Sequence, residues 1–177
     1  MLSCNQRNTG ITTTDVNVEN RPLLHEEYMS ALVSDSGVTR ARIEAKICDI
    51  YSNDTASYWF FPEGIYVEQF DSLFQVSARV WADTAYHFDR IGLWHLIKNV
   101  KLENAAGTTC ETSELFWNSR EPANSIESIY TDKFVKITEP TRVITAIGFK
   151  SNQSMSKFTF YEHAFDMEID EHNSPEE

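Results

Sequence analysis

The chain has 177 residues and a formal net charge of −12, and 41% of its residues are hydrophobic and 12% aromatic. This composition is too apolar for a disordered chain, and no apolar run approaches the ~20 residues that cross a bilayer. It therefore predicts one soluble globular domain without a transmembrane segment, and the acidic excess argues against general nucleic-acid binding.

Residues 1–20 are polar, rich in Asn and Thr and without an apolar period, which is typical of an N-terminal arm. They have neither the basic start nor the apolar run of a secretory signal, so the sequence favours a cytoplasmic origin. The three cysteines, Cys4, Cys48 and Cys110, are an odd number without metal-ligand spacing. This usage predicts reduced thiols and no disulfide framework.

A short helix is predicted after the polar segment, because Pro22 suits a first helical position and Gly37 suits a stop. Leu24, Tyr28 and Leu32 would lie on one stripe of that helix. A helix of this length does not hold together alone in water, so it must dock on its own domain or on a neighbour. The three stripe residues are therefore candidate partner contacts.

From Val38 onward the apolar period changes to two, which indicates strands. In the first of them, Arg40, Arg42 and Lys46 share one parity, and we expect them to form a solvated face. Leu96 and Val100 are expected to lie in the core. The other expected strands are at residues 57–61, 65–70, 73–82, 94–103, 133–137, 142–149 and 157–170, the last with a bulge or corner at 162–164.

Such a count, with no helix between the strands, predicts an all-β fold and excludes a doubly wound sheet. Long strands and the absence of a Cys, Trp, Cys spacing favour a single antiparallel jelly-roll sandwich of about eight strands over an immunoglobulin domain. The domain organisation expected is an N-terminal arm with a short helix at 1–36, the jelly roll at 37–170 and an acidic tail at 171–177.

No motif in the sequence specifies a reaction. The five histidines do not stand at metal-ligand spacing, and neither a phosphate-binding loop nor a nucleophile elbow is present. His87 and His163 each stand near an acidic residue, which would suit a metal or a general base, but such histidines commonly lie at strand ends without that role. The sequence therefore predicts a protein that is not an enzyme and has no cofactor and no metal.

The segment at residues 91–118 resembles part of the double-jelly-roll major capsid proteins of large DNA viruses. The residues that carry the resemblance are Ile91, Gly92, Leu96, Ile97, Lys98, Val100, Leu102, Glu103, Ala105, Ala106, Gly107, Trp117 and Asn118. Because the chain is long enough for one jelly roll only, the resemblance implies a penton (vertex) protein or a minor capsid protein. It implies a homopentamer that contacts major and minor capsid proteins, with a vertex fibre or glycan receptor as a further partner. It places the protein in the virion after synthesis in the host cytoplasm.

The alternative is a glycan-binding jelly-roll module, because exposed aromatic rings stack on sugars. The candidate rings are Tyr58, Trp59, Trp81, Tyr86 and Trp94. Trp81 shares the parity of Arg79, so we expect it to face outward and to be the best candidate for a partner contact.

Overall fold

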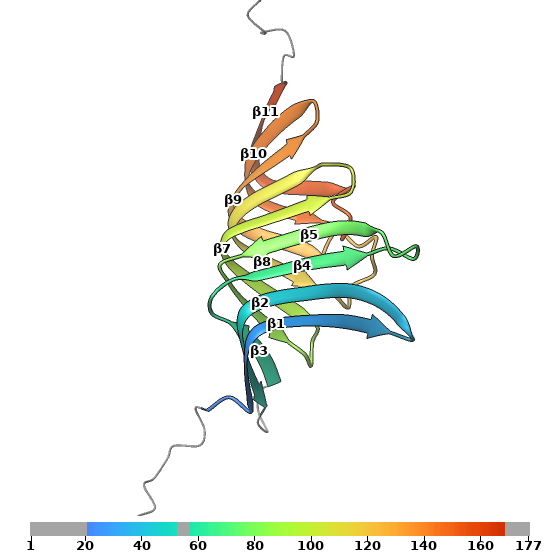
Figure 1. The fold of residues 1–177 in the computed structure, drawn as a ribbon. Coiled ribbons are helices and arrows are strands. Elements are labelled where there is room, and N and C mark those ends of the chain that lie inside the picture. Colours follow the sequence, from blue (N-terminus) through green and yellow to red (C-terminus); the bar gives the residue numbers. More distant parts are fainter. Residues whose placement is uncertain (1–20, 53–56, 169–177) are drawn as a thin grey trace, which may run out of the picture.

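A computed structural model describes residues 21–52 and 57–168, which form eleven strands joined in one sheet (Figure 1). The described part of the chain contains no helix, so none is long and apolar enough to cross a membrane. The strands are β1 (Leu24–Asp35), β2 (Val38–Ser52), β3 (Ser57–Phe61), β4 (Ile65–Phe70), β5 (Val76–Ala82), β6 (Thr84–Phe88), β7 (Leu93–Asn104), β8 (Thr109–Asn118), β9 (Ile129–Glu139), β10 (Arg142–Ser151) and β11 (Phe158–Glu168).

All strand pairs are antiparallel, and the long strands change partner along their length. The first half of β2 pairs with β4 and its second half with β3, while β7 pairs with β6 through residues 93–97 and with β5 through residues 101–104. Consequently β3 and β4 act as one strand bent at residues 62–64, and β5 and β6 as another bent at Asp83. The chain is thus an up-and-down meander of bent strands.

The bends lie along one line across the sheet, because the ladders change register at similar places in successive strands. The shifts lie between Ile97 and Val100 in β7, and between Ile147 and Phe149 in β10. Gly148 has a φ of +72°, and a Cβ there would lie 2.1 Å from Cδ2 of Tyr161, so the corner of β10 requires glycine.

The fold line divides the sheet into two facing layers. Layer A contains β4, β5 and residues 38–47, 100–112 and 135–146 of the bent strands. Layer B contains β3, β6 and residues 49–52, 93–97, 114–131 and 149–162. In Figure 1, β2, β4 and β5 lie side by side at the front, and β3 lies below them at a steep angle.

The core lies between the layers and takes alternate residues from each strand. Leu96 and Val100 are each only 1% exposed, which confirms the prediction for this strand. Phe149, Leu115 and Val135 are fully buried in the same cluster. Each such side chain contributes about 1.5–3 kcal/mol through removal from water.

The predicted helix is wrong, because residues 24–35 form strand β1, which pairs with β2 along its length. Leu24, Tyr28 and Leu32 stand four residues apart, and this spacing fits one side of a strand as well as one stripe of a helix. A ladder with β2 satisfies backbone groups that a short helix would expose to water. All three side chains are exposed on β1, and Tyr28 has a φ of +56°, although the register with β2 does not shift there.

The all-β antiparallel fold is confirmed, but the eight-stranded jelly roll is not the observed arrangement. Ladders of the eleven strands follow chain order once the bends are taken into account, whereas a jelly roll pairs strands that are distant in sequence. The bulge expected at residues 162–164 is confirmed by a register shift between β10 and β11. Leu73 and Phe74 are exposed in the β4–β5 turn and not buried in a strand, because β5 begins at Val76.

The predicted division into an arm, a domain and a tail stays a prediction. Its first boundary lies in the turn between β1 and β2. Residues 1–20 and 169–177, which include most of the arm and the whole acidic tail, lie outside the described residues.

Candidate functional site

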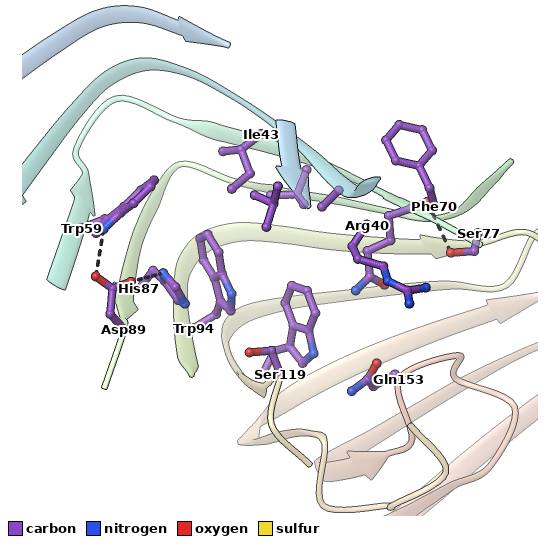
Figure 2. Close-up of a pocket in the computed structure, with 15 residues that line it drawn as sticks. Arg40, Ile43, Trp59, Phe70, Ser77, His87, Asp89, Trp94, Ser119 and Gln153 are labelled. Atoms are coloured by element: carbon purple, nitrogen blue, oxygen red, sulfur yellow. Dashed lines mark hydrogen bonds and ion pairs between the residues drawn. The ribbon is translucent and has the colours of Figure 1, made fainter. Parts of the chain in front are cut away.

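The two layers separate at the end of the molecule formed by β2 to β8 and enclose a cavity of about 650 Å³ (Figure 2). Its lining comes from both layers. Layer A and the end of β1 contribute Val33, Arg40, Ala41, Ile43, Val67, Gln69, Phe70 and Ser77, and the other side contributes Trp59, His87, Asp89, Trp94, Trp117, Ser119 and Gln153.

Aromatic rings cover much of layer B's side of this cavity. His87 stacks on Trp94 with ring centroids 4.2 Å apart, and Trp94 stacks on Trp117 at 6.0 Å. The three rings come from neighbouring strands, at positions that alternate with outward-facing residues. Together with Val67 and Phe70 they give the cavity largely apolar walls.

A polar group closes one side of the aromatic row. The indole Nε1 of Trp59 donates a hydrogen bond to Oδ2 of Asp89 at 3.0 Å, and Nδ1 of His87 lies 3.1 Å from Oδ1 of the same carboxylate (Figure 2). Burial lowers the pKa of His87 below its ordinary value, against the opposing effect of Asp89. The imidazole is therefore neutral at pH 7, and the carboxylate positions it beside Trp94.

Arg40 is the only cation among the described residues that line the cavity. Its guanidinium points into the space between the layers, toward Gln153 (Figure 2). Within residues 21–52 and 57–168 it has neither an ion pair nor a hydrogen bond, whereas Nη1 of Arg42 lies 3.3 Å from Oε2 of Glu68 on the outer side of layer A. The three residues expected to form one solvated face are therefore divided between two environments. Arg40 lines the cavity, whereas Arg42 and Lys46 make ion pairs on the outer side of layer A.

The indole Nε1 of Trp117 is buried and has no hydrogen-bond partner in the described part of the chain. A buried donor without a partner costs about 1–3 kcal/mol, so such groups are rare in folded proteins. By contrast, the indole of Trp59 in the same cavity is paired with Asp89. Trp117 therefore lines the cavity with its ring, while its buried Nε1 is left without a partner among the described residues.

A loop that we call the strap, residues 152–157, ends the cavity on the side of β9 to β11. Met155 reaches between the layers from this loop with 4% of its surface exposed and a φ of +53°. Nδ2 of Asn104, at the end of β7 in layer A, donates a hydrogen bond to the carbonyl of Ser154 at 2.9 Å. The strap thus connects the two layers across their open side.

The chain with this apolar cavity between two β layers matches a known protein family. The model of the lipopolysaccharide-assembly, LptC-related family matches residues 4–164. The chain belongs to this family. A comparison with curated proteins found no match.

Membership of the LptC-related family overturns the viral interpretation. The capsid resemblance, the penton role, the homopentamer with its capsid and fibre partners, and the virion location are all wrong, and so is the alternative of a glycan-binding module. The resembling segment, β7 and β8, is an alternating hairpin in which Trp94 pairs with Trp117. Alternation and a small-residue turn are common to many long antiparallel hairpins, so they do not identify a lineage.

The predicted partner residues do not line the cavity in this LptC-related chain. Leu24, Tyr28 and Leu32 lie on β1, and Trp81 lies half-buried on the outer side of layer A, with Nζ of Lys101 5.1 Å from its ring centroid. Their partner-binding role stays a prediction. In the described ranges, no group of three His, Cys, Asp or Glu side chains could hold a metal ion.

Of the five rings considered as sugar contacts, Trp59 and Trp94 line the cavity. Sequence reasoning did not assign the other lining residues to a binding site, above all Arg40 and Trp117. The inward parity of Trp94 and Trp117 could have indicated the cavity. Two tryptophans on the inner side of one hairpin bring more aromatic area than a tightly packed core requires. Nothing in the sequence showed that Arg40 would leave the face of its neighbour Arg42.

Proposed function

We propose that the cavity between the layers binds the acyl part of lipopolysaccharide. The observation that carries this proposal is an apolar, tryptophan-lined cavity with one cation, in a member of a lipopolysaccharide-assembly family. Its volume of about 650 Å³ lies in the ~300–1,000 Å³ range of ligand sites that are mostly apolar with a few placed polar groups.

The side chains divide the work of binding such an amphiphile. The rings of Trp94 and Trp117 with Val67 contact hydrocarbon, since burial of apolar area drives its transfer from water. Among the described residues Arg40 has no carboxylate partner and is therefore available to a phosphate of the headgroup, which a guanidinium binds through paired hydrogen bonds. The neutral state of His87 avoids a charge beside the hydrocarbon.

We also propose that this role is binding without catalysis, in the envelope of a bacterium. The family description names assembly of lipopolysaccharide and supports a carrier role. The polar groups of the cavity are held by one another, as in the pairing of Trp59 and His87 with Asp89, and this arrangement supports positioning of rings.

Calorimetric titration of the purified full chain with lipopolysaccharide tests the proposal. Arg40→Glu should weaken binding about tenfold or more, because a charge-assisted hydrogen bond contributes about 1.5–3 kcal/mol. Arg42→Glu is the matched control, since it makes the same charge change on the outer side of the same strand. Gln69→Trp, which fills the cavity from β4, should also reduce affinity.

Circular dichroism of each variant shows whether its fold is intact. The proposal fails if the unaltered chain does not bind lipopolysaccharide saturably. It also fails if Arg40→Glu and Arg42→Glu have equal effects while Gln69→Trp has none.

A further inference from the structure

The outer side of layer B carries a continuous row of aromatic rings that we call the aromatic face. It crosses six strands, from β2 to β9. Its members are Tyr51, Tyr58, Phe60, Tyr86, Phe88, His95, Phe116 and Tyr130.

Strand alternation puts these rings on the side of the sheet away from the cavity. Their neighbours Trp59, His87, Trp94 and Trp117 line the cavity, so residues one position away point outward. All eight are half-buried, which means that each keeps part of its surface in solvent.

The rings of the aromatic face stack on one another across the strands. Phe60 and Tyr86 have centroids 4.6 Å apart, and Tyr86 and His95 are 6.2 Å apart. The row continues with His95 and Phe116 at 4.3 Å and with Phe116 and Tyr130 at 5.3 Å, and the interplanar angles in the last two pairs are 13° and 14°. The result is a rigid surface, because stacked rings on a sheet have little rotamer freedom to lose.

A sheet face that only contacts water gains nothing from a row of stacked aromatic rings. Each of these half-buried rings keeps only part of its apolar area in solvent, but the rings are contiguous, and a contiguous exposed apolar patch marks an interaction site on a soluble protein. Antiparallel sheets with one face in water normally carry polar residues on it. The aromatic face therefore has the composition of a surface that is covered.

The polar atoms of the aromatic face suit a protein partner. The phenol hydroxyls of Tyr51, Tyr58, Tyr86 and Tyr130 make no hydrogen bond within the described residues, so four donors and acceptors stand among the apolar rings. Tyrosine is enriched in the centres of protein interfaces because it combines a large rigid ring with one polar group.

The charge around the aromatic face limits which kinds of partner can bind to it. The cations at its border are already paired, since Nζ of Lys133 lies 3.4 Å from Oε2 of Glu114 and Nζ of Lys150 donates to Oε1 of Glu127 at 2.7 Å. The whole chain has a net charge of −12. A second copy of the chain or an anionic bilayer would be repelled, whereas a basic surface would be attracted.

We propose that the aromatic face binds a second protein through an apolar surface bordered by basic side chains. Binding there leaves the cavity on the opposite side of layer B accessible. The chain would thus hold its lipid with one side of layer B and its partner with the other.

Photo-crosslinking in the source cells tests the proposal. A benzophenone amino acid is placed at Tyr58 or Tyr130 on the aromatic face, and at Lys136 or Thr138 on the outer side of layer A as the matched control. Adducts to one protein should form from the first pair of sites only. That protein is then purified, and its affinity for the full chain is measured with Phe116→Gln and, as control, Phe134→Gln.

The proposal is supported if Phe116→Gln weakens this complex at least about tenfold, Phe134→Gln leaves it unchanged, and added salt weakens it. It is overturned if no adduct forms from the aromatic face, or if both pairs of sites give the same adduct. It is also overturned if the chain instead floats with vesicles of phosphatidylethanolamine and phosphatidylglycerol, and Phe116→Gln abolishes flotation.

Discussion

The outer sides of the two layers are made by many of the same strands, yet their chemistry differs. On layer A, Glu68 lies 3.3 Å from Arg42 and 3.9 Å from Arg79, and Arg79 in turn lies 3.4 Å from Glu103, so charges of alternating sign cross the strands. On layer B the equivalent positions are the stacked rings of the aromatic face. Within β8 the change takes place between Glu111 and Phe116.

This difference shows what a period of two can and cannot predict. The inner side of both layers follows one rule, because any residue there must leave water. The residue types on the outer side depend on what surrounds each layer, and the surroundings change at the fold line in the middle of a strand. A single strand therefore passes through two environments, and only its outward-facing residues differ between them.

The largest effect is expected on the inner side that both layers share. Leu96→Ala should lower the free energy of unfolding by about 2–5 kcal/mol, because it leaves a cavity where the side chain is 1% exposed. Urea unfolding measures the change. A loss below about 0.5 kcal/mol, which is typical of surface positions, would contradict the placement of this strand.

A smaller loss is expected from the aromatic face. Phe116→Ala should lower the free energy of unfolding by about 1–2 kcal/mol, since it removes stacking on His95 and Tyr130. Phe134→Ala is the control at the fold line, outside the aromatic face, because Phe134 is 55% exposed and should cost less than about 0.5 kcal/mol. Equal losses of unfolding free energy for the two variants would contradict the special role of the aromatic face.

Acidification should lower the free energy of unfolding through His87, which lies between the layers. Burial lowers the pKa of His87 in the folded chain, so the unfolded chain binds a proton at a higher pH than the folded one. The stability lost on this account begins near the ordinary histidine pKa of 6.5 and grows as the pH falls toward the lowered value. His87→Phe keeps a ring against Trp94, and its urea midpoint should fall less between pH 8 and 5; a steeper fall would contradict the expectation.

The smallest effect is expected from the ion pairs of layer A. Arg79→Gln should change the free energy of unfolding by no more than about 0.5 kcal/mol, because the Arg79 side chain is 40% exposed and Glu68 keeps Arg42 as a partner. In 1 M salt the difference should vanish, since the screening length there is about 3 Å. A loss that persists in salt would mean that the charged face is also a packed surface.

The inner pattern of the strands was predictable from the sequence. Leu96 and Val100 have the expected burial although two left-handed residues, Lys98 and Asn99, lie between them. The bulge at the end of the chain was predictable as well, because the apolar parity shifts there. Burial imposes these patterns locally, so a single sequence contains them.

The cavity was not predictable, because it depends on how far apart two layers stand. Turn residues at 62–64 signal a change of direction, but they do not show that β3 and β4 pair with the same strand on opposite sides of a fold line. The placement of Arg40 opposite Gln153 results from that fold line and from the strap. Such contacts between distant segments leave no periodic trace in either segment.

The strap limits how far the cavity extends toward the last strands. Met155 is buried between the layers and Nδ2 of Asn104 donates a hydrogen bond to the carbonyl of Ser154, so this loop stands between the cavity and β9 to β11. An acyl chain bound as proposed would therefore stop at the strap. The six residues between the last two strands would then limit the length of acyl chain that the cavity accepts.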